Sequence, residues 1–112
     1  MAIKNDGSAW SWGQNSSGQL GLGNTTLKTT PEQIGGINGE KTWVKITCGA
    51  THTLALKQDG SLWTWGNNYL GALGDGTTTY KTSPVRIGGD TNWTTIFGGW
   101  HNSAALKSDG TM

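Results

Sequence analysis

The sequence predicts an all-β protein built from the four-stranded antiparallel blades of a β-propeller. Two observations lead to this prediction. The 112 residues include 19 Gly and 7 Trp but only 8 Lys or Arg and 7 Asp or Glu, a composition that disfavours helices. The chain also repeats itself with a period of about 50 residues, which suits one propeller blade.

The repeat accounts for the whole chain. Residues 2–13 align with residues 55–66, an offset of 53, and the same offset holds through the glycine-rich stretch that follows. Later the offset becomes 50, because one loop is three residues shorter in the second copy. We interpret the chain as a single repeat unit. Its parts are two repeats at about 2–54 and 55–104 and the start of a third copy at 105–112, within one unit of 1–112.

One period contains four predicted strands. The first is residues 43–48, where alternation places Val44, Ile46 and Cys48 on one face. The last is residues 83–87, which contains a proline and therefore suits the edge of a sheet. A polar loop rich in Gly and Asn precedes this edge strand, and its length and polarity argue against a strand there.

The two middle strands form a predicted hairpin. They are residues 52–57 and 61–66, joined by Asp59-Gly60, the strongest short hairpin signal in the sequence. A type I′ turn is expected there, which requires positive φ at both central residues. The chain thus holds the last two strands of one blade, a whole blade at about 43–87, and the first two strands of another. This is one whole blade plus two complementary half blades.

The repeat resembles the RCC1 repeat (regulator of chromosome condensation 1). The resemblance rests on Trp-Gly followed by spaced glycines in residues 12–23 and 65–76, on Cys-Gly-Ala-Thr-His at 48–52, and on the Asp-Gly turn. It extends over essentially the whole chain. We interpret the hallmark residues as structural: Trp12, Gly13, Gly18, Gly21, His52, Asp59, Gly60, Trp65, Gly66, Gly71 and Gly74.

The resemblance implies seven-bladed rings that mostly serve as binding platforms. Roles in the family include guanine-nucleotide exchange on a small GTPase, inhibition of β-lactamases and tryptophan-based ultraviolet sensing. Each depends on particular loops of a full ring, so none is transferred to this chain by the hallmarks alone. One hallmark also changes: the histidine at His52 becomes Asn102 in the next copy, where His101 lies one place earlier. His52 is expected to cap or cross-link backbone.

Three residues are candidates for contact with a partner: Trp100, His101 and Tyr69. Trp100 is the most distinctive, because the preceding repeat has Ala50 at that position and the fold does not require an aromatic ring there. We expect Trp100 to be more exposed than Trp65, and local packing remains the alternative to a contact. The other six tryptophans recur in pairs and are interpreted as packing between blades: Trp10 and Trp63, Trp12 and Trp65, Trp43 and Trp93.

Several function classes receive no support. A net charge of +1 gives no electrostatic basis for binding nucleic acid or an anionic membrane. No long apolar run and no signal peptide are present, so no membrane span is expected. Two histidines and the single Cys48 lack metal-ligand spacing, and no carboxylates are spaced as a catalytic pair. We therefore predict no metal, no cofactor and no enzymatic activity, and no compartment is indicated.

The predicted function is a non-enzymatic propeller module, a scaffold or protein-interaction unit. Because the half blades complement each other, copies of the chain are expected to associate head to tail into a closed ring. Each copy adds two blades, so a trimer gives six and a tetramer eight, both within the known range, and we favour the tetramer. One alternative is a piece of a longer propeller. The alternative function is a carbohydrate-binding propeller, in which Trp and Asn bind sugars.

Overall fold

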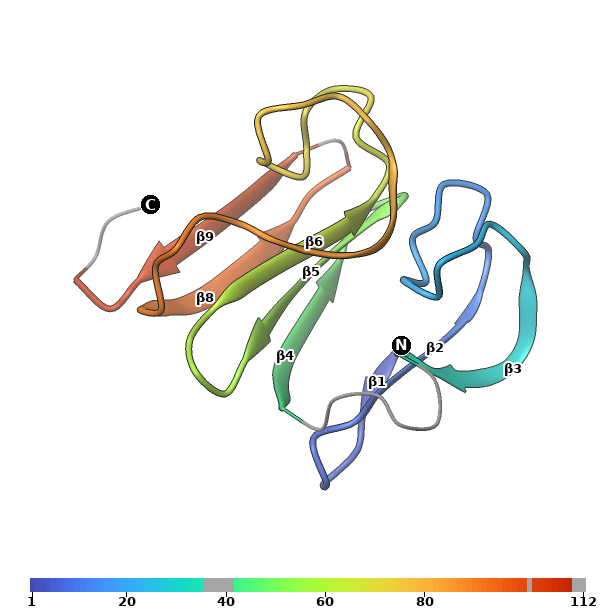
Figure 1. The fold of residues 1–112 in the computed structure, drawn as a ribbon, viewed down its shortest axis with the longest axis horizontal. Helices are drawn as coiled ribbons and strands as arrows, with labels where there is room; N and C mark the ends of the chain where they lie inside the picture. The colour runs from blue at the N-terminus through green and yellow to red at the C-terminus, as the bar shows by residue number, and fades with distance from the viewer. Residues whose placement is uncertain (36–41, 101, 110–112) are drawn as a thin grey trace.

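A computed structural model describes residues 1–35, 42–100 and 102–109, which form antiparallel strands in three sheets (Figure 1). The sheet orders are β1-β2-β3, β4-β5-β6-β7 and β8-β9. The strands are β1 (Ala2–Ile3), β2 (Ala9–Gly13), β3 (Lys28–Gln33), β4 (Trp43–Cys48), β5 (His52–Lys57), β6 (Leu62–Gly66), β7 (Lys81–Arg86), β8 (Trp93–Gly98) and β9 (Ser103–Lys107). Within these ranges, no helix is long and apolar enough to cross a membrane.

The middle sheet is the predicted whole blade, and the sheets on either side of it are partial blades (Figure 1). The predicted strands 43–48 and 52–57 have the observed bounds, whereas the strand predicted at 83–87 is Lys81–Arg86. The first sheet holds one strand more than predicted, because the two-residue β1 pairs with β2. The all-β propeller fold predicted from the sequence is therefore confirmed.

Two apolar clusters hold the sheets together, one on each face of the middle sheet. Strand β5 supplies both: Ala55 faces the first sheet, while Leu54 and Leu56 face β8 and β9. The strand is therefore almost entirely buried. The first cluster consists of Ala9, Ile34, Trp43, Ala55 and Trp65. The second cluster consists of Leu54, Leu56 and Leu62, with Ile87, Trp93, Ile96 and Ala105 packed against it.

The predicted face of β4 is wrong at one residue. The register of β4 on β5 shifts between Trp43 and Lys45, a bulge that leaves Val44 as the extra residue. Trp43 and Ile46, three positions apart, consequently contact the same apolar cluster, and Val44 is exposed. Strict alternation holds only after the bulge, where Ile46 and Cys48 share a face as predicted.

The turn at Asp59-Gly60 is also not the predicted type I′. Gly60 has φ of 84°, but no described residue other than glycine has positive φ, so Asp59 does not fit that turn. The N–H of Gly60 donates to Lys57 O (2.9 Å), and the N–H of Lys57 donates to Ser61 O (3.1 Å). This is a three-residue loop with glycine in the left-handed position, the other common way to close a hairpin.

Candidate functional site

The hallmark aspartate organises the hairpin through Ser61. The hydroxyl and the backbone N–H of Ser61 both donate to Asp59 Oδ1, at 2.6 and 2.9 Å. These bonds hold the pKa of the Asp59 carboxyl below its usual value. The carboxylate therefore stabilises the hairpin above the ordinary pKa of an aspartate, and this contribution is lost as the pH falls through the lowered pKa. The exposed position and local partners of Asp59 indicate a structural role.

His52 links two blades. Its Nε2 lies 3.1 Å from Asn102 O and 3.0 Å from Ser103 Oγ, both in the neighbouring sheet or its turn. The hydroxyl of Ser103 donates its hydrogen to Ala72 O at 2.7 Å. Because Ser103 uses its hydroxyl hydrogen in this bond and Asn102 O can only accept, the hydrogen in both contacts of His52 lies on Nε2, which is the donor. The buried imidazole thus has the cross-linking role expected from the sequence.

Two buried asparagines organise the long loops, and the sequence analysis did not single them out for this. Asn68 Nδ2 donates to the carbonyls of Thr77 (2.9 Å) and Thr79 (3.1 Å), while Asn68 Oδ1 accepts from the N–H of Leu73 (3.0 Å). Asn15 makes the corresponding bonds in the first loop. The available signal was their recurrence at the offset of 53, three residues after the second Trp of each copy.

The hallmark glycines occupy backbone conformations that other residues rarely adopt. All have φ between 72° and 107°, in or beyond the left-handed region. Their positions in the repeat therefore favour glycine for structural reasons. They are Gly13, Gly18, Gly21, Gly60, Gly66, Gly71 and Gly74.

The tryptophans predicted to pack between blades do not all do so. Trp43 and Trp65 are buried in the first cluster, with ring centroids 5.8 Å apart, and Trp63 packs against that cluster. Trp12, the repeat equivalent of Trp65, is 41% exposed. It lies in the first sheet, and the corresponding neighbouring sheet is not part of the described structure. Within the described structure Trp12 therefore does not pack between two sheets, and its expected packing between blades stays a prediction.

Two of the three candidate partner-binding residues lie in segments at one end of the molecule. Trp100 belongs to the turn between β8 and β9, and Tyr69 to the long loop between β6 and β7; both segments lie at the upper end of the view (Figure 1). The bond from Ser103 to Ala72 ties the two segments together. Trp100 is 74% exposed, against 0% for Trp65, so it is the more exposed of the two as expected. His101 lies outside the described residues.

Replacing Trp100 by Ala should lower the free energy of unfolding by less than about 1 kcal/mol, as for an ordinary surface substitution. The reason is its high exposure, which leaves little buried area to lose. Denaturant unfolding followed by far-ultraviolet circular dichroism measures the change. A loss of several kcal/mol would instead place the ring in a packed environment.

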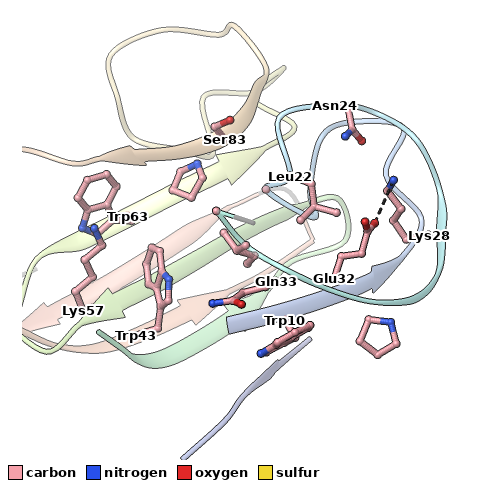
Figure 2. Close-up of a pocket in the computed structure, with 15 residues that line it drawn as sticks. Trp10, Leu22, Asn24, Lys28, Glu32, Gln33, Trp43, Lys57, Trp63 and Ser83 are labelled. Atoms are coloured by element: carbon pink, nitrogen blue, oxygen red, sulfur yellow. Dashed lines mark ion pairs between the residues drawn. The ribbon is translucent and has the colours of Figure 1, made fainter. Parts of the chain in front are cut away.

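The larger inter-sheet cleft has an aromatic wall and a volume of about 650 Å³ (Figure 2). Trp43 and Trp63 lie on one side, and Lys57 Nζ lies 3.7 Å from the centroid of the Trp63 ring. Lys28 and Glu32 form an ion pair of 3.1 Å on the opposite side. The charged groups are thus engaged with ring faces or each other. This arrangement suits packing between blades better than chemistry on a substrate.

A second, smaller cleft of about 400 Å³ lies between the middle sheet and β8–β9. Its lining is mainly apolar and includes Leu54, Leu62, Trp93 and Ala105. Within the described ranges, no group of three His, Cys, Asp or Glu side chains could hold a metal ion. Two kinds of feature therefore stand out. One is the pair of inter-sheet clefts, and the other is the exposed aromatic residues Tyr69 and Trp100 at the end of the molecule where their two segments lie, which we call the loop end.

Comparison with known proteins agrees with the blade architecture. The model of the regulator of chromosome condensation (RCC1) repeat matches residues 6–56 and 59–106. Protein RCC2 homolog of Danio rerio is 46% identical over 88 residues, which are 78% of this chain and 18% of that protein. Ultraviolet-B receptor UVR8 of Arabidopsis thaliana is 34% identical over 113 residues, 99% of this chain and 26% of the receptor.

A solved structure shares the fold. The structure of Kap60 bound to yeast RCC1 (Prp20) matches with a TM-score of 0.71 and 26% identity, over 89% of this chain and 26% of that one. The chain thus spans about a quarter or less of these relatives. Repeat hallmarks, four-stranded blade and family match agree: the chain belongs to the RCC1-repeat family of β-propellers.

Proposed function

We propose that the chain is a non-enzymatic RCC1-repeat unit that serves as a scaffold for protein interaction. The observation that carries the proposal is the exposed aromatic set of the loop end: Tyr69 and Trp100 are 72% and 74% exposed. Aromatic residues are enriched at protein interfaces, where they supply large contact area. Yeast RCC1, a relative in fold, is found bound to a protein, Kap60.

The partner surface is tested by capture with immobilised chain, comparing the native sequence with a Tyr69→Ala/Trp100→Ala double variant. A partner that the native chain retains should then be purified and titrated with each protein. The double variant is expected to bind it about 30-fold or more weakly than the native chain, as for interface hot spots. Tyr80→Ala, an exposed aromatic in the same long loop, is the matched control. Equal affinities of all three proteins would contradict the proposal.

The scaffold is completed, we infer, by head-to-tail association of copies. The β8–β9 sheet corresponds to the first two strands of the middle blade, and β2–β3 to its last two. Joining β8–β9 of one copy to β2–β3 of the next gives a four-stranded blade and covers strand edges that would otherwise favour aggregation. Three copies give six blades and four give eight, and the tetramer is favoured.

The assembly is tested by measuring mass in solution. Light scattering coupled to size exclusion at micromolar concentration should give three or four times the 11.8 kDa of the chain, with four expected. Closure into a ring gives one defined mass, whereas an open head-to-tail contact gives a filament whose mass grows with concentration. A folded, stable monomer of 11.8 kDa would overturn the self-association.

The carbohydrate-binding alternative has less support in this arrangement. Trp43 and Trp65 are buried, and Lys57 lies over the ring of Trp63, so these rings are not open for stacking on sugars. A glycan titration followed by tryptophan fluorescence separates the two functions. A saturable response at millimolar sugar would favour the alternative, and no response would contradict it.

A further inference from the structure

The second apolar cluster contains repeat equivalents of most residues of the first cluster, but not of its central tryptophan. The offsets of 53 and 50 that define the repeat relate four residues of the first cluster to four residues that belong to the second cluster or pack against it. On strand β6, Trp65 fills the middle of the first cluster, and the second cluster contains no described residue at the corresponding place. The related pairs are Ala9 and Leu62, Ile34 and Ile87, Trp43 and Trp93, and Ala55 and Ala105.

The glycines beside the two clusters show the same difference. A Cβ added to Gly21 would lie 2.7 Å from Trp65 Nε1, so the indole packs directly on this backbone. Gly74 is the repeat equivalent of Gly21 and has a nearly identical φ, 72° against 73°. An added Cβ there would meet no described atom within 4 Å. The smaller cleft, which Gly74 lines, is therefore the place that an equivalent indole would take.

A hydrogen-bond acceptor is also present for that indole. Gln19 O accepts from both Thr53 Oγ1 and Trp65 Nε1, each at 2.8 Å. Its repeat equivalent, Ala72 O, accepts from Ser103 Oγ at 2.7 Å, the counterpart of the threonine bond. A carbonyl oxygen has two lone pairs, and among the described residues no indole donates to the second one of Ala72.

We propose that the smaller cleft is a socket for Trp12 of a second copy of this chain. Trp12 is the repeat equivalent of Trp65, it stands on β2 as Trp65 stands on β6, and it is 41% exposed. In the socket its ring packs on Gly74 and against Trp93 and Ala105, and its Nε1–H donates to Ala72 O. This inference rests on the proposed head-to-tail association and names the residue that drives it.

The experiment uses two complementary variants of the full chain. Trp12→Ala removes the inserted ring, and Ala105→Phe fills the socket from its wall. Each variant alone should show a dissociation constant raised by about 30-fold or more, the effect of losing an interface hot spot. Mixed in equal amounts, they should form a one-to-one complex of defined mass, because each retains the surface that the other lacks. Sedimentation velocity measures both results.

Two further variants control the interpretation. Trp12→Phe keeps a ring but lacks the N–H, so its dissociation constant should fall between those of the native chain and Trp12→Ala. Tyr80→Ala, an exposed aromatic away from the socket lining, should associate like the native chain. Near-ultraviolet circular dichroism of dilute samples establishes that each variant is folded.

The outcomes separate the socket from the association itself. If native copies associate and neither Trp12→Ala nor Ala105→Phe weakens them, the socket is wrong and the association stands. A native chain that stays monomeric at all concentrations overturns the association and the socket with it. A mixture that remains monomeric while the single variants are weakened also overturns the socket, because it shows no complementarity.

Discussion

Replacing Trp65 by Ala is expected to lower the free energy of unfolding by about 3–5 kcal/mol, as for large aromatics removed from a core. Trp65 is fully buried between two sheets, packs edge-to-face with Trp43, and donates to Gln19 O. The substitution leaves a cavity at the joint between blades and removes a buried hydrogen bond. Because domains of this size have about 5–15 kcal/mol in total, a large share of the stability is lost. Urea unfolding measures the change.

The repeat supplies a matched control for this substitution. Trp12→Ala changes the same residue type at the equivalent position, but on a 41% exposed side chain. Measured in dilute solution, where copies are apart, it should cost clearly less than Trp65→Ala. Equal losses would mean that the inter-sheet cluster is not what stabilises the chain.

Replacing Gly60 by Val is expected to lower the free energy of unfolding by about 3 kcal/mol or more. Two effects add: a β-branched residue resists the φ of 84°, which costs about 1–3 kcal/mol, and an added Cβ would overlap the carbonyl oxygen of Thr91. The backbone near Thr91 must then move, and the N–H of Trp93 donates to Gly60 O in the same contact. Thermal unfolding by circular dichroism gives the loss.

Gly88→Val separates the two effects. Gly88 has φ of 64°, and an added Cβ there would meet no described atom within 4 Å. This variant therefore carries the backbone strain without the overlap, and it should be distinctly more stable than Gly60→Val. Identical stabilities would show that the contact with Thr91 contributes nothing, whereas native-like unfolding of Gly60→Val would contradict the hairpin.

The repeat made the fold predictable, because a strand or turn predicted in one copy had to fit the equivalent residues of the other copy. Strands 43–48 and 52–57 and the hairpin at Asp59-Gly60 followed from alternation and turn chemistry. The bulge at Val44 did not, since a bulge inserts a residue without changing the local composition. The turn type was missed for a related reason: the side chain of Asp59 binds Ser61 and favours a three-residue loop.

The surroundings of a candidate residue could be predicted where that residue differs from its equivalent in the other repeat. They could not be predicted where the two repeats have the same residue. Trp100 has no counterpart, and its exposure followed from that difference. Trp12 and Trp65 are equivalent in sequence but not in surroundings, because burial depends on which sheet lies next to each of them. The role of Asn68 depends on carbonyls up to eleven residues away, a distance at which local patterns carry no geometric information.

The two-residue strand β1 gives the proposed association a particular route. Ala2 and Ile3 pair with Trp10 and Ala9, the positions that an incoming β9 would take by equivalence with β5 on β6. β1 leaves residues 11–13 of β2 without a strand on that edge among the described residues. In the proposed association, β9 of a second copy can first pair with residues 11–13 of β2. It then replaces β1 at Trp10 and Ala9, one residue pair at a time. β1 and β9 of a second copy therefore compete for the same positions of β2, and β1 must leave Trp10 and Ala9 before the four-stranded blade is complete.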